Sequence, residues 1–426
     1  MHWANPYGEE PVDKAKPFCI SRKEVWQAYK RVKANRGAAG VDGVTIEQFE
    51  LDLENNLYKL WNRMSSGSYF PSMVRRVEIP KADGRMRPLG IPTVNDRIAQ
   101  MVVKSRLEPE IEPHFHQNSY GYRPGRSAIQ ALSVARKRCW DYNWALDLDV
   151  KGFFDNIDHP LLLKAVKFHT DVKWMILYIE RWLKAPVQLT NGQVLSSNKG
   201  TPQGGVISPL LANLFLHYTF DLWMDRNCPT IAFERYADDI ICHLRSEKQA
   251  KWLRWKLEER LKECGLGLHP QKTKIVYCKD DCRAGSYRRQ SFDFLGYTFR
   301  PRLARTRQGR FFVGFLPAIS NKSAKQIRRT IKSWRIHLRS DLSIEDIAQW
   351  SNPSLTGWIN YFGRFYRSAI ASLMRYFDRI LIRWAVRKYK RFKGSRKRAS
   401  AWLMGLRRRD PGLFAHWRPL NTTAGQ

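Results

Sequence analysis

The sequence predicts an α+β protein in which a sheet in the middle of the chain is flanked by helical regions on both sides. Three observations support this fold class. Residues 144–150, WALDLDV, alternate strictly, which places every second residue on one face of a strand: Trp144, Leu146, Leu148 and Val150. IAFERY and IICHL are strand-like segments joined at residues 237–239. Helical periodicity dominates before this region and again from about residue 317.

The elements that precede the central sheet are predicted from periodicity and turn residues. SRKEVWQAYKRVKANRG has helical periodicity and stops at Gly37. TIEQFELDLENNLYKLWNRM is predicted to form one amphipathic helix, and DRIAQMVVKSRLEPEIEPHF another. VRRVEIP and RPLGIP are predicted as short strands around the turn KADGR, and NSYGYRPGRS as a loop.

The elements after residue 150 follow the same logic. A long helical stretch is expected first, and then the hairpin-like segment QLTNGQVLS. The loop NKGTPQGGVISP would open the helix LLANLFLHYTFDLWM, and FDFLGYTF is predicted as one strand. From about residue 383 the helical pattern becomes densely basic.

The charge of the chain points to a polyanionic partner. It carries 74 Lys and Arg against 39 Asp and Glu, a formal net charge of +35, which opposes compaction unless a polyanion offsets it. Nucleic acid fits, because phosphate contacts release counterions; an anionic membrane surface is the competing interpretation. No apolar run approaches the roughly 20 residues of a spanning helix, so no membrane crossing is expected.

The cysteines and the first residues favour a reducing compartment. Seven dispersed cysteines argue against a disulfide framework, and MHWANPYGEEPVDK lacks a signal-peptide pattern. Cys278 and Cys282 are closely spaced but have no second Cys or His pair at finger spacing, so zinc is not expected. We therefore expect a protein of the reducing cytosol.

Three carboxylates are predicted to meet at one edge of the central sheet. Asp149 ends one strand, with Asp147 pointing the same way, and Asp238 and Asp239 lie at the tip of a hairpin. A surface turn is the simple alternative for an Asp pair. Three carboxylates in a dry site require a cation, however, and oxygen ligands select Mg²⁺ or Mn²⁺. Two such ions could align a 3′-hydroxyl with a leaving pyrophosphate, which is the chemistry of nucleotidyl transfer.

Six segments, in order, resemble the conserved boxes of reverse transcriptases. YADD at 236–239 is similar to the YxDD box, and DVKGFF at 149–154 to the first catalytic box, whose spacing favours Asp149 over Asp147. GTPQGGVISP at 200–209 resembles the box that underlies the incoming nucleotide. IPKADGRMRPLGIP resembles the fingers hairpin that grips triphosphate, LHPQKTKIV the Lys-bearing segment, and FLGYTF the primer grip.

The resemblance narrows to group II intron reverse transcriptases, also called intron maturases, and covers nearly the whole chain. RVKANRGAAGVDGVTIEQF and SYGYRPGRSA are similar to blocks of that family, and NPSLTGWINYFGRFYRS at 352–368 to its thumb or maturase segment. Many members end in a Cys- and His-bearing HNH endonuclease domain. This sequence has no cysteine beyond residue 282, so second-strand cleavage is not expected.

The family implies a right-hand polymerase fold with fingers, palm and thumb. The expected divisions are a flexible segment (1–18), fingers (19–135), palm with a fingers-type insertion (136–300), thumb or maturase domain (301–382) and a basic region (383–426). Trp358, Phe362 and Phe365 recur at helical spacing, and we expect a buried thumb face rather than stacking on RNA bases.

The resemblance also implies roles for acidic and nucleotide-binding residues. Asp149 and Asp238 would hold the metal ions, while Asp239 would assist at longer range or only tune its neighbour. Phe154 would be the steric gate against a ribose 2′-hydroxyl; the alternative is a core aromatic. Gln203 would contact the incoming nucleotide; the alternative is a cap of the following helix.

Basic residues have two expected sites. Lys81 and Arg87 would pair with triphosphate oxygens, unless they contact the nucleic-acid backbone in general. Lys272 would protonate the leaving pyrophosphate or be one surface lysine among many. The tail RWAVRKYKRFKGSRKR interleaves cations with aromatics and is predicted to bind intron RNA or target DNA through Arg387, Lys388, Lys390 and Arg391.

The expected function is that of an RNA-directed DNA polymerase with dNTPs, primer-template and target DNA as partners. It would also bind intron RNA to promote splicing, and copy the intron into cDNA during retrohoming. Two alternatives stay open: a splicing factor with an unused polymerase site, or a free-standing reverse transcriptase used in DNA repair or phage defence. The sequence does not determine the oligomeric state, and a dimer is compatible with it.

Overall fold

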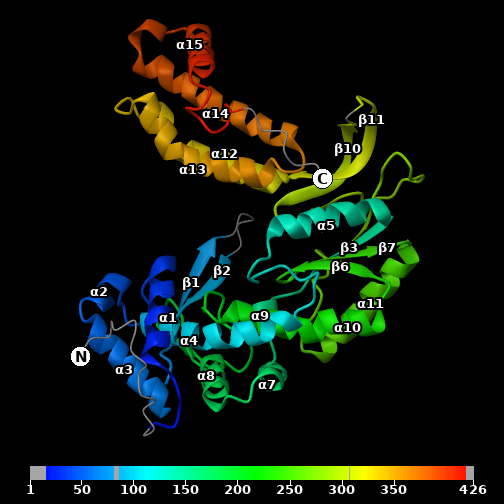
Figure 1. Cartoon of the computed structure of the whole chain (residues 1–426). Helices are drawn as coiled ribbons and strands as arrows, with labels where there is room; N and C mark the ends of the chain where they lie inside the picture. Colours follow the sequence, from blue (N-terminus) through cyan, green and yellow to red (C-terminus); the bar gives the residue numbers. More distant parts are fainter. Residues whose placement is uncertain (1–15, 81–85, 307, 419–426) are drawn as a thin grey trace. The chain divides into compact units, whose positions relative to one another are not determined.

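The computed structural model describes residues 16–80, 86–306 and 308–418, which form two compact units (Figure 1). Unit 1 holds the described residues up to Ala131 together with Trp144–Ile275. Unit 2 holds Leu132–Asn143 together with the described residues from Val276 onward. Unit 1 is therefore interrupted once, by a short segment that belongs to unit 2.

The first described helices of unit 1 are α1 (Arg22–Asn35), α2 (Ile46–Glu50) and α3 (Leu53–Ser66), and α4 (Val94–Ile111) follows after two strands. The start of α1 is a capping box, in which the Ser21 hydroxyl accepts from the Glu24 N–H and the Glu24 carboxylate accepts from the Ser21 N–H. The helices predicted around residues 21–37 and 96–115 are thus confirmed.

The single helix predicted over residues 45–64 is wrong, because α2 and α3 are separate. Asp52 lies between them with φ −133°, outside the helical region. Asp side chains compete with helical backbone hydrogen bonds, which makes such a residue a natural break. The Asn56 side chain then donates to the Phe49 carbonyl at the end of α2.

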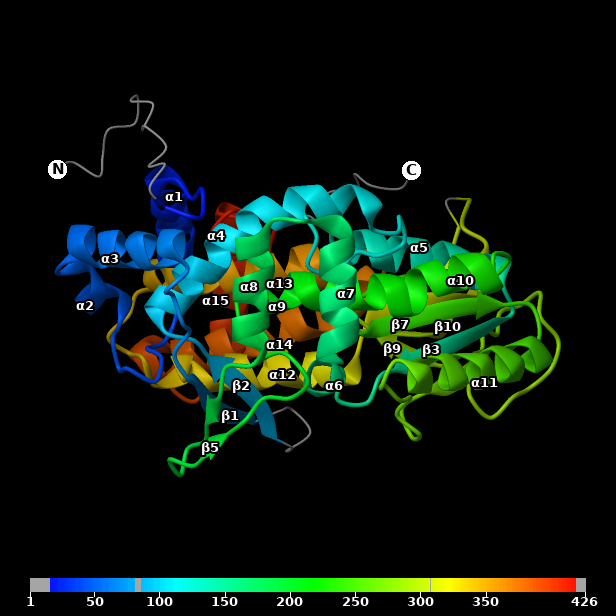
Figure 2. The same ribbon diagram turned by 90° about the horizontal axis from the view of Figure 1, so that it is seen from below.

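A small sheet in unit 1 confirms two predicted hairpins. β1 (Val74–Pro80) and β2 (Met86–Ile91) are antiparallel, as are β4 (Val187–Gln188) and β5 (Val194–Leu195). β4 pairs in parallel with β1, so the strand order is β2-β1-β4-β5. Figure 2 shows β1, β2 and β5 together, apart from β3 and β7 of the central sheet.

The central sheet has the strand order β6-β7-β3-β8; it confirms the strands predicted for residues 144–150, 231–236 and 240–244, and it adds β8, which was not predicted. Its members are β3 (Trp144–Asp149), β6 (Ala232–Tyr236), β7 (Asp239–Leu244) and β8 (Lys274–Tyr277). β3 pairs antiparallel with β7 from Trp144↔Leu244 to Asp149↔Asp239, so both strands bring an aspartate to the same edge. The apolar face predicted for residues 144–150 is buried.

Further helices of unit 1 lie between the strands along the chain, and two of them, α10 and α11, run along one face of this sheet (Figure 1). The helices are α6 (Phe153–Asn156), α7 (His159–His169), α8 (Lys173–Leu183), α9 (Ser208–Leu216), α10 (Leu222–Asn227) and α11 (Glu247–Glu263). The helix predicted over residues 210–224 is interrupted by a π-helical segment, His217–Asp221. α5 (Ala128–Asp141) continues from unit 1 into unit 2.

Unit 2 contains a three-stranded sheet, ordered β11-β10-β9. Its strands are β9 (Phe292–Phe294), β10 (Tyr297–Arg305) and β11 (Phe311–Ile319). The prediction of one strand for FDFLGYTF is wrong, since the chain reverses at Leu295 and Gly296. Both have positive φ, 49° and 81°, as the tightest two-residue hairpin turn requires.

The helices of unit 2 share one core with the last residues of β11. They are α12 (Asn321–Ser333), α13 (Ile344–Phe362), α14 (Arg367–Lys388) and α15 (Arg396–Arg409). Their buried residues run from Ile319 to Trp417, so the core extends through the basic region. The predicted division at residues 382 and 383 falls inside α14.

The aromatic residues of the maturase-like segment pack as predicted. Trp358 and Phe362 are partly buried against the core, and the Trp358 ring stacks on Trp334 with centroids 5.6 Å apart. Phe362 and Phe365 both meet the ring of Tyr297, at 5.4 and 5.5 Å. Among the described helices of both units, none combines the length and apolar character that crossing a membrane requires.

Candidate active site

The predicted acidic residues lie at the edge where β3, β6 and β7 meet. A two-residue turn, Ala237 and Asp238, joins β6 to β7. Asp149 ends β3 directly opposite Asp239. Burial raises the pKa of Asp238, and the negative charge of Asp149 raises it further. The structure thus brings Asp149 and Asp238 together, while Asp239 is exposed.

Lys272 forms an ion pair with Asp149. Its ammonium donates to both carboxylate oxygens, at 2.9 and 3.1 Å. The segment around it is tied to the end of β3, because the His269 N–H donates to the Asp149 carbonyl at 2.7 Å. The sequence alone left Lys272 as a phosphate acid or a surface lysine; the structure adds that its charge neutralises Asp149.

The residues present fit a divalent metal ion by their chemistry. Asp149 and Asp238 offer hard oxygen donors, and their mutual repulsion is what a bound cation would relieve. Over the described part of the chain, no three His, Cys, Asp or Glu side chains are grouped closely enough to hold a metal by themselves. Nearby Arg87 and the ammonium of Lys272 already lower the pKa of Asp238 from its raised value.

Arg87 and Gln203 form a second part of the site. The Arg87 Nε donates to the Gln203 side-chain oxygen at 2.8 Å, and both residues reach the surface. The Gly90 N–H donates to the Gln203 carbonyl at 2.7 Å, which fixes the loop against β2. Lys81, predicted to act beside Arg87, lies outside the described residues.

The loop that carries Gln203 requires glycine at its points of close approach. A Cβ on Gly204, which has φ +123°, would lie 2.5 Å from the Gly90 carbonyl oxygen. The helix that follows is capped by another residue: the Gln100 side-chain oxygen accepts from the Val206 and Ile207 N–H groups. Gln203 is therefore not the helix cap, and its amide is turned to Arg87 instead.

Phe154 lies on α6 and is 7% exposed. Its ring meets Phe153 edge to face, with centroids 5.4 Å apart. Its carbonyl accepts from the Thr201 N–H at 2.8 Å, so α6 also anchors the Gln203 loop. Burial gives this residue a packing role, and the steric gate remains a prediction.

The loop NSYGYRPGRS packs directly against the Asp238 turn, a contact that sequence reasoning missed. Its backbone pairs with β6 on both sides of Arg235, through Asn118 and Tyr120. A Cβ on Gly121 would lie only 2.4 Å from the Ala237 nitrogen. Burial raises the pKa of Tyr122, and the Asp238 charge adds to this, which places the Tyr122 hydroxyl near the carboxylates.

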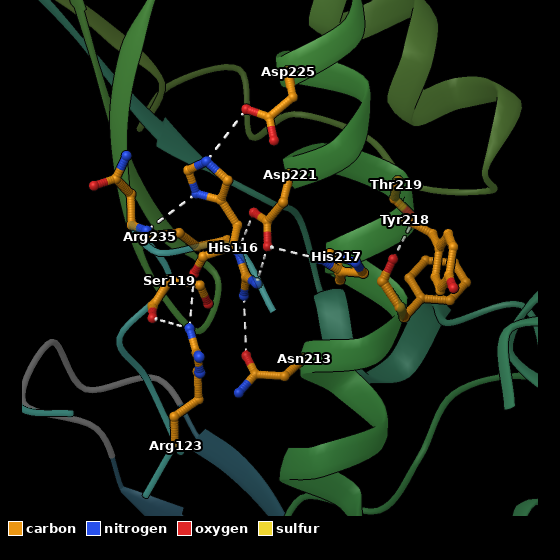
Figure 3. Close-up of polar contacts among 12 residues, drawn as sticks. His116, Ser119, Arg123, Asn213, His217, Tyr218, Thr219, Asp221, Asp225 and Arg235 are labelled. Atoms are coloured by element: carbon orange, nitrogen blue, oxygen red, sulfur yellow. Dashed lines mark hydrogen bonds and ion pairs between the residues drawn. The ribbon is translucent and has the colours of Figure 1, made fainter. Parts of the chain in front are cut away.

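A buried polar network behind the turn was also missed (Figure 3). Arg235 on β6 and Asp221 in the π-helical segment are both fully buried, and they form a two-pronged ion pair. Asn213 on α9 bonds the same guanidinium. The available signal was the ERY sequence in a strand, because charged residues in a buried strand require partners.

The basic residues predicted on the tail differ in their surroundings. Arg387, Lys390 and Arg391 are exposed. Lys388 is half-buried, and its ammonium donates to the carbonyl oxygens of Ser340 and Leu342, at 3.2 and 2.5 Å. Lys388 therefore fastens the end of α14 to the loop that precedes α13.

An acidic hairpin turn beside an aspartate-ended strand, with a lysine paired to one carboxylate and an arginine near the other, is an arrangement typical of nucleotidyl-transferring polymerases. Comparisons with known proteins agree. The family model described as reverse transcriptase (RNA-dependent DNA polymerase) matches residues 79–299. The model described as group II intron, maturase-specific domain, matches residues 324–402. The chain belongs to the reverse transcriptase family, and it is of the group II intron type.

Curated relatives support the same assignment. The chain is 31% identical to protein YkfC of Escherichia coli (strain K12), over 74% of this chain and 90% of YkfC. It is 35% identical to the group II intron-encoded protein LtrA of Lactococcus lactis, over 58% of this chain and 44% of LtrA. It is 27% identical to the putative COX1/OXI3 intron 1 protein of Saccharomyces cerevisiae, over 63% of this chain and 37% of that protein. The chain thus spans less than half the length of these two intron proteins.

Proposed function

We propose that this chain extends a primer on an RNA template with deoxynucleotides, and that the reaction occurs at Asp149 and Asp238. The observation that carries the proposal is the convergence of two repelling carboxylates with two cations, Lys272 and Arg87, at one sheet edge. Repelling acids held next to cations suit a site where phosphate charge and metal charge must both be accommodated. Reverse transcriptases generally use divalent metal ions such as Mg²⁺.

The acidic residues would hold the metal ions. Bound Mg²⁺ or Mn²⁺ would supply the charge that aligns the attacking 3′-hydroxyl with the leaving pyrophosphate. Asp149 and Asp238 would be the ligands, with exposed Asp239 acting at longer range. Lys272 would leave Asp149 when the site is loaded and would then donate a proton to the pyrophosphate oxygen.

Other residues would bind the nucleotide. Arg87 would contact the triphosphate through its terminal NH2 groups, since its Nε donates to Gln203, and Lys81 would bind the triphosphate beside it. Gln203 would hold Arg87 in place and touch the nucleotide. Phe154 would limit the space at the 2′ position of the sugar. Its substitution by Val would then raise ribonucleotide incorporation, measured against deoxynucleotide incorporation.

We propose that the two units correspond to the parts of a right-hand polymerase. The β1–β2 hairpin and α1–α4 would be fingers, the central sheet the palm, and α12–α14 the thumb or maturase domain. The exposed cations Arg387, Lys390 and Arg391 would bind intron RNA or target DNA, with splicing and retrohoming as the outcome. These reactions would take place in the bacterial cytosol, on the nucleoid.

Primer extension tests the polymerase function directly. The assay would use an RNA template, a DNA primer, dNTPs and Mg²⁺, with the wild type beside Asp238→Ala. Asp141→Ala, at an exposed carboxylate at the end of α5, is the matched control. Extension by the wild type and the control, but not by Asp238→Ala, is expected. A wild type that is inert but binds structured RNA tightly would replace this proposal with a splicing-only function.

A further inference from the structure

We propose that the buried ion pair of Arg235 and Asp221 is a positioning device for Asp238. By holding the peptide group between Ala237 and Asp238, the pair would fix the direction in which the Asp238 carboxylate leaves the turn. The inference rests on the proposed polymerase function, and it assigns roles to residues that touch neither nucleotide nor primer.

Arg235 is held on two sides within the fold. Its Nε and Nη2 donate to the two oxygens of Asp221, at 2.8 and 2.6 Å (Figure 3). Its Nη1 donates to the Asn213 side-chain oxygen at 3.0 Å and to the Ala237 carbonyl oxygen at 3.2 Å. Paired donors in a planar fork leave a guanidinium little freedom to rotate.

The contact with Ala237 links this fixed group to catalysis. Ala237 has φ +55°, a left-handed conformation that a non-glycine residue adopts at a cost of about 1–2 kcal/mol. A turn of this kind is retained only if its surroundings enforce it. Because a peptide group is planar, holding the Ala237 carbonyl also fixes the nitrogen of Asp238. Rotation of the peptide group between Ala237 and Asp238 is then restricted, so the Asp238 side chain has less freedom to change its direction.

Asn213 connects the Arg235 guanidinium to the loop that contains Gly121. While its side-chain oxygen accepts from Arg235, its Nδ2 donates to the Gly121 carbonyl at 2.6 Å. The backbone of Arg235 is also fastened, since its N–H donates to Asn118 and its carbonyl accepts from Tyr120. The Asp238 turn is therefore held between a buried guanidinium and the segment 118–121.

The π-helical segment explains how Asp221 reaches Arg235. Asn213 and Asp221 are eight residues apart, which in a regular α-helix would separate them by about 80° around the axis. The wider turn at His217–Asp221 reduces that angle, so both side chains meet one guanidinium. Such bulges are rare and are frequently found at functional sites.

Electrostatics keeps the pair charged. Burial by itself would raise the pKa of Asp221, but the charge and hydrogen bonds of Arg235 outweigh it, and the pKa lies below its ordinary value. Removing one partner leaves a buried charge alone and destabilises the fold. The test must therefore separate positioning from stability.

Arg235→Lys is the central variant, because it keeps the charge but cannot reach Asp221 and Ala237 together. Glu234→Gln is the matched control: Glu234 is the residue before Arg235 on β6, is equally buried, and pairs with His243 further along β7. Both variants would be compared at a temperature well below their measured melting points. The readouts are single-turnover kcat, primer-template Kd, and Mn²⁺ binding to the protein by electron paramagnetic resonance.

A misplacement of the order of 1 Å at a reacting centre can reduce a rate by about 10²-fold. We expect Arg235→Lys to lower kcat by about tenfold or more and to weaken Mn²⁺ binding, with primer-template Kd unchanged. Glu234→Gln should leave kcat and Mn²⁺ binding near wild type. Equal losses in the two variants, or unchanged kcat and Mn²⁺ binding in folded Arg235→Lys, would overturn the inference.

Asn213→Leu provides a second route if Arg235→Lys does not fold. This variant removes the bonds of Asn213 to Gly121 and to the Arg235 Nη1, and it leaves the Arg235–Asp221 ion pair in place. A folded Asn213→Leu protein with reduced kcat and unchanged primer-template Kd supports positioning, and one with wild-type kcat refutes it. A wild type without primer extension would refute the polymerase function itself, an outcome distinct from either of these.

Discussion

Gly121 lies so close to the Asp238 turn that adding one methyl group tests how tightly the turn is held. In Gly121→Ala, the new Cβ would lie 2.4 Å from the Ala237 nitrogen and 2.9 Å from the Tyr236 carbonyl carbon. Ordinary contact between such atoms begins near 3.5 Å, so the two segments must separate by about 1 Å. Both neighbours are backbone atoms, so rotation of a side chain cannot supply that space.

The cost follows from what anchors the loop. Separation by about 1 Å would stretch the Asn213–Gly121 bond, now 2.6 Å, and the Tyr120–Arg235 bond, now 2.8 Å. Overpacking of this kind typically destabilises a protein by about 1–3 kcal/mol. A displacement of the turn by a similar distance should reduce kcat by about 10²-fold.

Two measurements check this prediction: denaturant unfolding for stability and single-turnover primer extension for kcat. Gly267→Ala is the control, because among the described residues no atom lies within 4 Å of the place its methyl group would take, and its backbone needs no left-handed conformation. It should change both quantities little. If Gly121→Ala matched the wild type in stability and kcat, the turn would not be held as tightly as the distances indicate.

Three further predictions follow from the site and the basic region. Asp238→Asn should stabilise the metal-free protein at neutral pH. Because the pKa of Asp238 is raised in the folded protein, its carboxyl contributes stability below the pKa of the unfolded chain, and this contribution is lost as the pH rises through the folded-state pKa. In denaturant unfolding, the gain in free energy of unfolding of Asp238→Asn over the wild type should therefore grow as the pH rises through this range. Lys272→Gln should change the free energy of unfolding by less than about 1 kcal/mol, since its ion pair with Asp149 is partly exposed, yet lower kcat; an unchanged kcat would leave Lys272 only a surface role. Lys388→Met should destabilise unit 2 by about 1–3 kcal/mol and leave the salt dependence of RNA binding unchanged. Neutralising Arg387, Lys390 and Arg391 should instead reduce the slope of log Kd against log salt concentration by about 0.7–0.9 for each phosphate that the protein no longer neutralises.

The elements that sequence reasoning predicted well are those fixed by local pattern. Strict alternation identified β3, and the pairing of β3 with β7 confirms that Asp149 and the hairpin acids share one edge. The Asn-Gly pair in QLTNGQVLS identified the β4–β5 hairpin. These signals depend on neighbours in the chain, so tertiary structure does not need to be known.

The errors arose where a local break was hidden inside a regular pattern. Asp52 interrupts an otherwise amphipathic segment, and Leu295 adopts a positive φ that its side chain gave no reason to expect. The π-helical segment is likewise invisible, because one residue too many in a helical turn leaves the apolar pattern almost intact. At Leu295 and in the π-helical segment the backbone geometry was set by packing, whereas at Asp52 the side chain itself favours the break, and the amphipathic pattern concealed it.

The sequence predicted the acidic and nucleotide-binding residues of the candidate site, but not the buried residues that hold the Asp238 turn. Asp149, Asp238, Arg87 and Gln203 were found by motif, and the structure brings them into one region of unit 1. Asp221 and Asn213 look ordinary in their own segments, and the charge of Arg235 in a buried strand indicated that it needs a partner but not which residue that partner is. Their significance comes only from meeting one another across segments that lie 14 and 22 residues apart.

Several unfavourable features are concentrated around the Asp238 turn, and this supports a functional origin for them. Ala237 has a left-handed backbone, Asp238 carries a raised pKa, and an ion pair is buried where apolar residues of similar volume would often be as stable. A chain selected only for stability would replace any of these. Natural sequences depart from local rules mainly at functional sites. The clustering of three such departures within a few residues therefore argues that the turn is kept for what Asp238 does.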